Sequence, residues 1–400
     1  MRTLNVHRLL AGTGMYSGYL DALNVGDAEE QALRTARDTV RETLRNGLRE
    51  LQEHGIAHLV EQRFIAKAAS LPSMRPRFRM QGSMKYRTLN DPAQKPPQEI
   101  DVDDGVYLPT SFITANGAAR PILASRLYFQ AVEKILEPLC NKKGWILDRD
   151  KQSCVRIRIS PEAHLDLPLY AIPDDQFMQL AEDHALSKSA LQADDLEFSE
   201  ATFKELPTDQ IMLARRNADW RESDPRQIED WFLDAIAEHG EVVRHTCRYL
   251  KGWRDFQMEK SKISSLLLMA CVIATFDTLG GRLASDRDDL ALLEAARKLP
   301  VQFAGPIANP IFPDQILNDD WTMAERATFI RLAEALKQEI EAALNATYNK
   351  DVAIRHFRNA FGDRIPYSPD LITMDDKEAA VLAYPRAKVV APVVPRTTSG

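Results

Sequence analysis

The sequence predicts an α+β protein in which a mixed core of helix and strands is followed by a second, helical domain. Three observations predict this: a long amphipathic helix pattern near the N-terminus, short alternating strand patterns after it, and a helical pattern throughout from about Asp224 onward. The length of 400 residues is typical of about two domains. We therefore expect domains at residues 1–210 and 211–374 and a flexible C-terminal tail at residues 375–400.

The first predicted element is a helix from about Asp27 to Glu53, where apolar residues recur at helical spacing between many charged residues. A proline-marked loop then leads into a strand at 77–80. A second strand is predicted at 100–108, after a pair of prolines, and it should break at Pro109.

The core continues with a helix predicted at 124–137, which should stop before Pro138 because the residue before a proline disfavours helical geometry. The alternating run at 155–159 predicts a strand, and 164–170 predicts another short strand. These strand patterns predict a core of mostly antiparallel strands.

The helical pattern of the second domain begins at Asp224, a favourable N-cap residue, with Pro225 at the first helical position. Further helices are predicted at 263–279, 286–298 and 322–346. Tryptophans in this domain are expected to be core residues rather than platforms for stacking a base: Trp231 and Trp253.

Composition and charge restrict the classes of function. Apolar residues make up 44% of the chain, enough for a sizeable core, and the formal net charge is −7, which argues against a protein that coats nucleic acid. The apolar stretch at 265–274 is much shorter than the roughly 20 residues of a membrane span, and the N-terminus lacks an apolar signal region. We therefore expect a soluble, cytoplasmic protein without a membrane partner, in which this stretch is a buried helix.

The cysteines indicate the same compartment. They are far apart and form no CxxC pair: Cys140, Cys154, Cys247 and Cys271. This spacing predicts neither a zinc site nor a disulfide framework, and it is typical of a reducing compartment.

Two aspartates in the second strand are the clearest candidates for chemistry. Alternate residues of a strand share a face, so Asp101 and Asp103 lie together, while Asp104 points to the other face and is expected to be structural. Close carboxylates repel unless a cation lies between them, and Mg²⁺ prefers such oxygen ligands. Asp166, alone among apolar neighbours, is a candidate third carboxylate that would complete a two-metal site. The alternative is that these acids are surface or turn residues.

A Gly82–Ser83 turn precedes the acidic pair and follows the strand at 77–80. Turns of this kind can cradle a phosphate. Three features thus follow one another: a turn that can cradle a phosphate, an acidic pair on the next strand and a lone acid on a third strand. This order predicts nucleotidyl transfer, in which a hydroxyl attacks a metal-bound nucleoside triphosphate.

This order of motifs resembles the polymerase-β-type nucleotidyltransferase superfamily. Within it, the sequence is most similar to the bacterial cyclic-oligonucleotide synthases of the cGAS/DncV-like class (CD-NTases), especially the 3′,3′-cyclic GMP-AMP synthases. The matching segments lie between about residues 75 and 275: 81–90, 99–109, 164–173, 223–232 and 247–255. The resemblance implies a polymerase-β-like core and a helical second domain, the bilobed architecture of oligoadenylate synthases, with the active site in the cleft between them.

The resemblance also implies roles for individual residues. The catalytic residues, which would hold two Mg²⁺ ions with Mn²⁺ as an alternative, are Asp101, Asp103 and Asp166. The residues that would contact the triphosphate are Gly82, Ser83 and Lys251, aided by Ser264 or Ser265. Those that would line the nucleotide pockets or contact a base are Gln81, Tyr86, Ser223 and Asn309.

Each of these assignments has a structural alternative. Lys251 lies in a predicted helix with other basic residues, so it could be a solvated surface charge. Ser264 and Ser265 could be ordinary helix N-cap residues. Tyr86 could be a core residue.

The implied activity is the joining of ATP and GTP, or of either alone, into a cyclic dinucleotide with release of pyrophosphate. The implied product is 3′,3′-cyclic GMP-AMP, a second messenger that activates an effector in anti-phage defence. The sequence shows no Cys/His zinc cluster, and its net charge is acidic, so we do not expect activation by DNA. Two alternatives are an RNA- or tRNA-directed nucleotidyltransferase and a catalytically silent nucleotide-binding module.

The C-terminal stretch 391–400 is proline-rich and lacks hydrophobic periodicity, which predicts an extended tail. It ends in Gly400, whose unhindered carboxylate could enter a narrow enzyme channel. The resemblance implies that a ubiquitin-like ligase joins Gly400 to other molecules; the alternative is a chain end without function.

Overall fold

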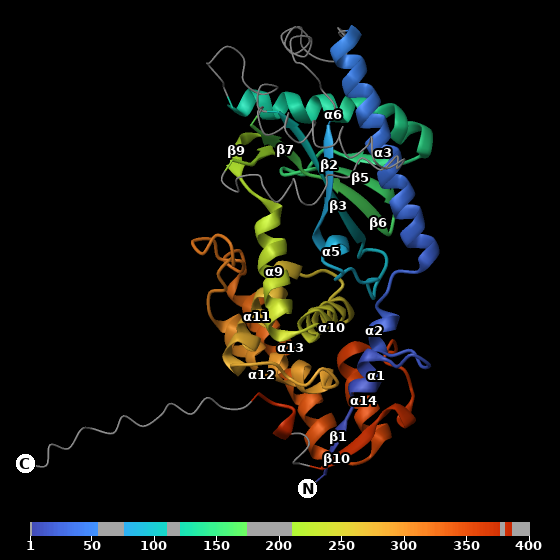
Figure 1. Cartoon of the computed structure of the whole chain (residues 1–400), viewed down its shortest axis with the longest axis vertical. Coiled ribbons are helices and arrows are strands. Elements are labelled where there is room, and N and C mark those ends of the chain that lie inside the picture. Colours follow the sequence, from blue (N-terminus) through green and yellow to red (C-terminus); the bar gives the residue numbers. More distant parts are fainter. Residues whose placement is uncertain (1, 55–75, 110–120, 174–209, 377–380, 386–400) are drawn as a thin grey trace, which may run out of the picture. The chain divides into compact units, whose positions relative to one another are not determined.

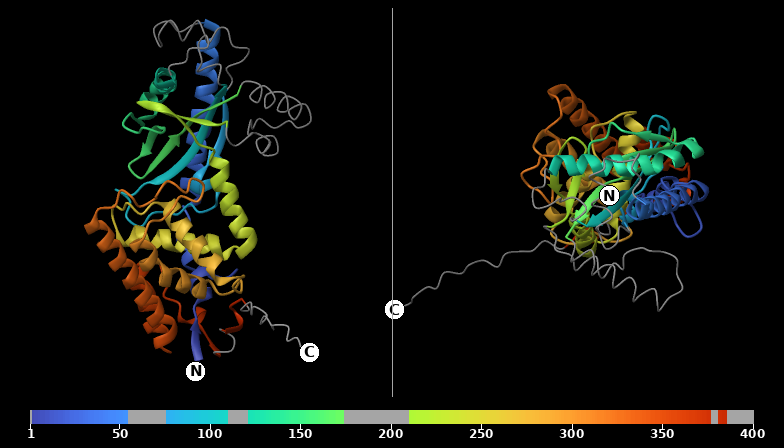
Figure 2. Two further views of the ribbon diagram at one scale, coloured as in Figure 1. Left: turned by 90° about the vertical axis from the view of Figure 1, so that its left-hand side faces the viewer. Right: turned by 90° about the horizontal axis from the view of Figure 1, so that it is seen from above.

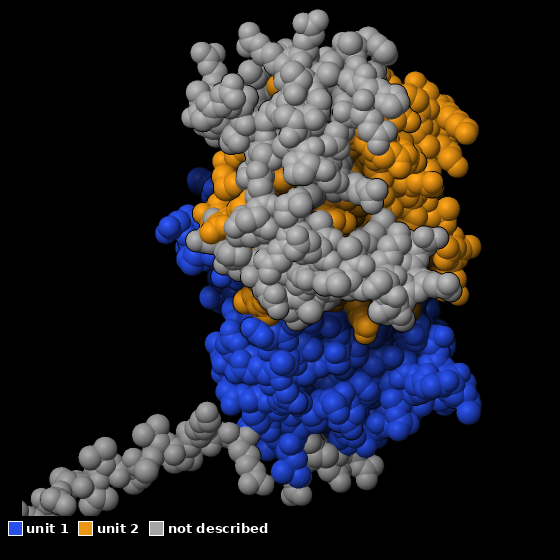
Figure 3. Space-filling model, turned by 45° about the horizontal axis from the view of Figure 1, so that its top comes forward, with its two compact units in different colours: residues 1–23, 233–400 blue, residues 24–232 orange. Residues whose placement is uncertain are grey.

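The computed structural model describes residues 2–54, 76–109, 121–173, 210–376 and 381–385. The chain forms two compact units. The first unit comprises residues 24–232 and is orange in Figure 3, where the key labels it unit 2. The second unit comprises residues 1–23 together with 233–400 and is blue there, labelled unit 1. The first unit combines a sheet with helices and the second is mainly helical, so the fold class is α+β, as the sequence predicts.

The first unit is built on a sheet of eight strands in the order β4-β5-β6-β3-β7-β8-β9, with β2 also paired to β3 (Figure 1). The bounds of its strands are β2 Arg77–Gln81, β3 Ile100–Pro109, β4 Ile146–Asp148, β5 Val155–Ser160, β6 Ala163–Leu167, β7 Leu169–Ile172, β8 Met212–Arg215 and β9 Ala218–Glu222. The predicted strands at 77–80, 100–108 and 155–159 are all present. Pro109 is the last residue of β3 rather than a residue beyond it.

The prediction of an antiparallel core is wrong at the centre of the sheet, because β6 and β7 both run parallel to β3. The segment 164–170, predicted as one strand, contributes to both of them. Pro168 separates the two strands, since it has no N–H to donate, and its carbonyl accepts a hydrogen bond from the N–H of Val106 at 2.9 Å. The parallel arrangement decides which residues face each other at the site below.

The core of this unit lies between the sheet and two helices, α3 (Asp27–His54) and α6 (Pro121–Lys143), which contact each other and are seen in Figure 1 and in both views of Figure 2. The predicted end of α6 before Pro138 is wrong, because the helix continues to Lys143. Leu136 and Cys140 are both buried, so apolar packing on either side of Pro138 stabilises the continued helix.

The second unit contains the predicted helices. Their bounds are α10 Val242–Gln257, α11 Ser265–Leu279, α12 Asp288–Ala304, α13 Met323–Glu341 and α14 Lys350–Phe361, with short helices α1 His7–Ala11 and α2 Tyr19–Ala22 and a π-helical turn at Ala342–Ala346. The apolar stretch in α11 is buried, and Trp253 is 1% exposed, in agreement with a core role. Within the described ranges, no helix has the length and apolar content needed to cross a membrane.

Helix α9 (Pro225–His239) begins in the first unit and ends in the second. Asp224 acts as its N-cap, because its Oδ1 accepts a hydrogen bond from the N–H of Arg226 at 2.9 Å. All four cysteines are buried and free.

The limits of the two units differ from the predicted domains 1–210 and 211–374. Strands β8 and β9 extend the sheet, so the first unit continues to Phe232. The N-terminal strand β1 (Arg2–Asn5) pairs instead with β10 (Thr373–Asp376) in the second unit, which includes the first residues assigned to the tail. Residues 386–400, with Gly400, lie outside the described residues.

A buried acid connects the N-terminal segment to helices α10 and α12 within the second unit. Asp288 is fully buried and accepts hydrogen bonds from Tyr249 Oη at 2.7 Å and His245 Nδ1 at 2.9 Å, and its Oδ1 lies 3.3 Å from His7 Nδ1. Burial opposes ionisation, but the hydrogen bond from His245 and the nearby ring of His7 lower the pKa of Asp288 to about 2.

We expect Asp288→Asn to lower the free energy of unfolding by about 2 kcal/mol near neutral pH, because a carboxyl whose folded-state pKa is depressed stabilises the native state when ionised. This contribution is present above the usual pKa of 3.8 and is lost as the pH falls towards about 2, so the difference between wild type and variant should shrink over that window. Urea unfolding at several pH values measures it. Asp363→Asn, whose side chain is 98% exposed, is the control and should change little.

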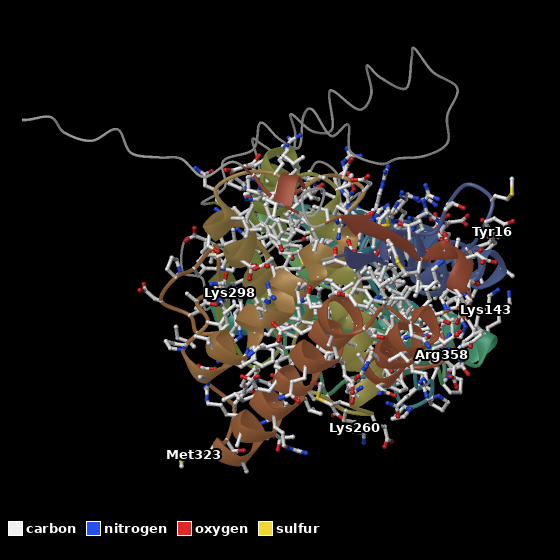
Figure 4. All side chains as sticks on the ribbon, turned by 90° about the horizontal axis from the view of Figure 1, so that it is seen from below. Tyr16, Lys143, Lys260, Lys298, Met323 and Arg358 are labelled. Carbon is white, nitrogen blue, oxygen red and sulfur yellow. The ribbon has the colours of Figure 1, made fainter. Side chains whose placement is uncertain are left out.

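Two large exposed apolar side chains of the second unit, Tyr16 and Met323, lie apart. Tyr16 and Met323 are 59% and 87% exposed and stand at different margins of the view in Figure 4. Isolated residues of this kind are ordinary on protein surfaces, and these two do not form one apolar patch.

Candidate active site

Two neighbouring strands bring the predicted acidic residues together. Asp101 and Asp103 share one face of β3, and the parallel strand β6 places Asp166 opposite Asp103. The predicted metal-binding trio therefore lies on one face of the sheet. Asp104 points to the other face, where it is fully buried and forms an ion pair with Arg41 of α3 at 2.6 Å, the structural position that the alternation predicts.

His164 is a fourth member of this cluster. The β3–β6 register places it opposite Asp101, and its Nε2 lies 2.9 Å from Asp101 Oδ1 and 4.0 Å from Asp166 Oδ1. One ligand atom from each of Asp101, His164 and Asp166 lies within 4.8 Å of the others. The other ring nitrogen, Nδ1, is 2.6 Å from Glu99 Oε2.

The electrostatics of the cluster follow from its crowding. Burial, together with the charges of Asp101 and Asp166, raises the pKa of Asp103 well above its usual value. Burial alone would lower the pKa of His164, but the adjoining Asp101 carboxylate outweighs it and the pKa is raised. Arg156 of β5 partly compensates the negative charge through two hydrogen bonds of 2.6 Å to Asp166.

The residues present fit a divalent cation. Carboxylate oxygens are preferred ligands of Mg²⁺ and Mn²⁺, and a cation beside the trio would relieve the repulsion that raises the pKa of Asp103. One other cluster with suitable donors occurs among the described residues, in the second unit: Glu238, His239 and Asp277. It contains none of the predicted site residues.

The predicted Gly-Ser turn lies directly against the acidic cluster. Gln81 ends β2 opposite Asp103, and Gly82 starts the short helix α5 (Gly82–Lys85) with φ +63°, a left-handed conformation that glycine adopts without strain. A Cβ atom added at Gly82 would lie 2.1 Å from Asp103 Oδ2. The structure therefore brings Gly82 and Ser83 to the acidic pair, while their contact with phosphate stays a prediction.

Three further predicted residues belong to the same unit. Gln81 Oε1 accepts a hydrogen bond from Tyr170 Oη at 3.1 Å. Tyr86 is buried, with its ring centroid 6.1 Å from that of Phe232, and burial raises its pKa. Ser223 follows β9 and donates its N–H to the carbonyl of Ile211 at 3.1 Å. The core alternative for Tyr86 agrees with its burial, and the nucleotide contacts of all three stay predictions.

The remaining predicted residues belong to the second unit. Lys251 is 5% exposed, so the alternative of a solvated surface charge is wrong. Burial, and secondarily the charge of Arg254, lowers its pKa to about 8. Such a residue, buried with a perturbed pKa, is a candidate for a functional cation.

The serines and Asn309 have structural partners. Ser264 is the N-cap of α11, since its Oγ accepts a hydrogen bond from the N–H of Leu267 at 3.1 Å, and Ser265 Oγ lies 3.4 Å from Arg254 Nη1. Asn309 Oδ1 accepts hydrogen bonds from the N–H groups of the loop that follows it, at 2.9 and 3.2 Å. The N-cap alternative is thus confirmed for Ser264, and a base contact by Asn309 stays a prediction.

Comparison with known proteins decides the family. Residues 76–170 match the family model for the nucleotidyltransferase domain of DncV-like cyclic GMP-AMP synthases, and residues 240–374 match the model for the C-terminal domain of cyclic GMP-AMP synthase. A cyclic GMP-AMP synthase of Vibrio cholerae is 31% identical over 353 residues, which are 83% of this chain and 77% of the relative. The chain belongs to the DncV-like nucleotidyltransferase family.

A second relative and two solved structures are also similar to this DncV-like protein. A cyclic GMP-AMP synthase of Escherichia coli strain TW11681 is 32% identical over 306 residues, covering 73% of this chain and 68% of the relative. The solved structure of Vibrio cholerae DncV with a linear intermediate, 5′ pppA(3′,5′)pG, has a TM-score of 0.73 and 26% identity and covers 94% of this chain and 100% of that one. A DncV variant solved with ATP, GTP and 5MTHFGLU2 has a TM-score of 0.76 and 25% identity, with the same coverage.

Sequence reasoning missed the polar partners of the acidic trio in this DncV-like site. A signal for them was present, because each contributing strand has polar residues two positions apart, which share a face. The pairs are Arg156 and Arg158 in β5, His164 and Asp166 in β6, and Glu99, which directly precedes β3, with Asp101 in β3. The alternation shows which residues of a strand lie together, but not which strands are neighbours.

Proposed function

We propose that this DncV-like nucleotidyltransferase is a cyclic dinucleotide synthase that joins ATP and GTP, with 3′,3′-cyclic GMP-AMP as its product. The observation that carries the proposal is the acidic cluster of β3 and β6 with the Gly82–Ser83 turn against it. The choice of substrates is supported by relatives named cyclic GMP-AMP synthase and by DncV structures that contain ATP, GTP or a linear intermediate.

The proposed reaction is two successive nucleotidyl transfers. The 3′-hydroxyl of one nucleotide gives its proton to solvent as its oxygen forms a bond to the α-phosphorus of a second nucleoside triphosphate. The bond between that phosphorus and the bridging oxygen breaks, and pyrophosphate departs with the electrons of this bond. The linear intermediate, which retains one triphosphate, then closes into a ring by the same exchange of bonds. No oxidant or reductant is needed.

The chain's own residues would contribute position and charge. Asp101, Asp103 and Asp166 would hold two divalent ions, Mg²⁺ or Mn²⁺, which when bound neutralise the triphosphate and polarise the attacking hydroxyl. The left-handed turn at Gly82 brings main chain close to Asp103. Lys251 would supply a positive charge for the triphosphate.

Incubation of the purified protein with Mg²⁺ and ATP, GTP or both, followed by mass spectrometry, tests the proposal. We expect pyrophosphate and a cyclic dinucleotide with two 3′–5′ linkages, formed best when both triphosphates are present. The Asp101→Asn protein is the inactive control. Extension of an added RNA or tRNA without any cyclic product would favour a polymer-directed nucleotidyltransferase instead.

We expect Lys251→Met to raise the Kd for nucleoside triphosphate about tenfold or more, because one charge-assisted contact is worth about 1.5–3 kcal/mol. The wild-type charge should be lost as the pH rises through about 8, so triphosphate affinity should fall over that range in the wild type but not in the variant. Binding titrations from pH 7 to pH 9 measure both effects. Lys260→Met, at an exposed position of the same unit, is the control. Unchanged affinity in Lys251→Met would contradict the role.

We also propose the biological setting implied by the family: a cytoplasmic enzyme whose product activates an effector in anti-phage defence, without activation by DNA. A ubiquitin-like ligase acting on Gly400 belongs to the same proposal. Isolation of covalent adducts from cells and mapping of their linkage to Gly400 or to a lysine would test it.

A further inference from the structure

We propose that Tyr170 and Gly105 are positioning residues for the turn at Gly82–Ser83, and that both act through the buried carboxamide of Gln81. This inference deepens the proposed function and rests on it, since it assumes that the turn contacts a nucleoside triphosphate. It gives roles to two residues that lie outside the acidic trio and outside the turn.

The residues concerned lie on the face of the sheet that carries the acidic trio. Alternate residues of β3 share a face, so Gly105 lies on the same side as Asp103 and Tyr107, between the two. The antiparallel strand β2 places Gln81 opposite Asp103. The parallel strand β7 places Tyr170 opposite Tyr107. Gly105 is therefore a position without a side chain in the middle of this group.

The side chain of Gln81 occupies the space that Gly105 leaves. A Cβ atom added at Gly105 would lie 2.0 Å from Gln81 Nε2 and 2.9 Å from Tyr107 Cε2. Glycine weakens the interior of a strand and is found there where another group approaches closely. Gly105 has no positive φ, so the need for space, rather than the backbone conformation, explains the glycine.

Tyr170 holds the carboxamide in this space. Its Oη donates a hydrogen bond of 3.1 Å to Gln81 Oε1, and both residues are buried. The ring of Tyr170 is stacked on that of Tyr107, with the ring centroids 4.8 Å apart, which fixes the position of the hydroxyl. Among the residues that the structure describes, Gln81 Nε2 has no hydrogen-bond partner, so the orientation of the amide depends on the bond from Tyr170.

The position of Gln81 affects the turn directly. Gln81 is the last residue of β2, and the next residue is Gly82, where the turn begins. Gly82 lies so close to the acidic trio that a Cβ atom added to it would be 2.1 Å from Asp103 Oδ2. A displacement of Gln81 would therefore move the turn relative to the carboxylate. Groups that bind a triphosphate and its metal must be held in a fixed geometry, and buried partners supply this support.

Two substitutions disturb the carboxamide in different ways. Gly105→Ala adds a methyl group that displaces it, and because the closest atom is the end of a flexible side chain, the strands can stay in place. Tyr170→Phe removes the hydroxyl and keeps the stacked ring. The probe is a non-hydrolysable analogue of ATP or GTP, whichever binds the wild type more tightly, titrated by calorimetry in the presence of Mg²⁺. No turnover is involved.

We expect each substitution to raise the Kd of the analogue about tenfold, because the turn is no longer held in one position. The double variant should also bind about tenfold more weakly than the wild type, rather than about a hundredfold, since two changes that act through one group are not additive.

Tyr128→Phe is the matched control. Tyr128 is a buried tyrosine of the same unit, and its Oη donates a hydrogen bond of 3.1 Å to the carbonyl of Val106. The variant loses a buried hydroxyl of the same kind at a place that does not contact Gln81. It should bind the analogue as the wild type does, even where its melting temperature falls as far as that of Tyr170→Phe.

Three results would overturn the proposal. They are wild-type affinity in Tyr170→Phe or in Gly105→Ala, an additive loss of about a hundredfold in the double variant, and a loss in Tyr128→Phe as large as that in Tyr170→Phe. Because binding is measured without product formation, the positioning role can fail in an active synthase. Equally, it can hold in a protein that makes no cyclic dinucleotide, which would count against the proposed function alone.

Discussion

Asp103→Asn is expected to abolish formation of the cyclic product, with a rate at least about a hundredfold below that of the wild type. The substitution keeps the shape of the side chain but removes a hard anionic ligand from the centre of the acidic trio. Product formation from ATP and GTP, followed by chromatography, measures the loss. A folded Asp103→Asn protein with a tenth of the wild-type rate would show that the carboxylate assignment is wrong.

The same variant should not be less stable. A carboxylate whose folded-state pKa is raised destabilises the native state when it is ionised, and Asp103 is buried beside two like charges. Its neutral replacement removes this cost, so we expect a melting temperature equal to or above that of the wild type without divalent metal. Added Mn²⁺ should raise the melting temperature of the wild type more than that of the variant. A large drop in stability without metal would instead indicate that Asp103 has a structural role.

Gly82→Ala is expected to inactivate the enzyme by a different route, with a loss of about a hundredfold in kcat/KM. Its added Cβ would lie 2.1 Å from Asp103 Oδ2, so the carboxylate or the turn must move. The backbone at this position, with φ +63°, also strains any residue with a Cβ atom.

The variant Gly144→Ala separates the effect of the steric clash with Asp103 from the effect of backbone strain. Gly144 has φ +70° in the same unit, but an added Cβ would meet nothing within 4 Å. Both variants should therefore lose about 1 kcal/mol of stability, because a residue with a Cβ atom is strained in the left-handed conformation at either position. Only Gly82→Ala should lose activity. Equal activity in both variants would mean that the turn does not support the catalytic carboxylate.

Local sequence patterns correctly predicted which residues share a face of a strand or helix. Strand alternation placed Asp101 and Asp103 together and Asp104 on the opposite face, where it pairs with Arg41. The helical stripe and cap residues predicted α9 and the buried helix α11 well. These predictions succeed because they depend on neighbours within a few positions along the chain.

What the sequence could not supply is the pairing of distant strands. Nothing local indicates that β6 runs parallel to β3, so nothing indicates that His164 lies beside Asp101. The helix through Pro138 was missed for a related reason, because the packing of Leu136 and Cys140 overrides a local preference. Lys251 is the clearest case: its sequence neighbours suggest a solvated charge, while the fold buries it.

The pairing of β1 with β10 has a consequence for how this protein is made. Its helical unit is discontinuous, since residues 1–23 leave the ribosome first but find their partners only in the chain after residue 232. The sheet unit can fold during synthesis, while the N-terminal strand stays without its partner until Asp376 has been translated. The helical unit, which includes the helix that contains Lys251, is therefore completed only late in biosynthesis.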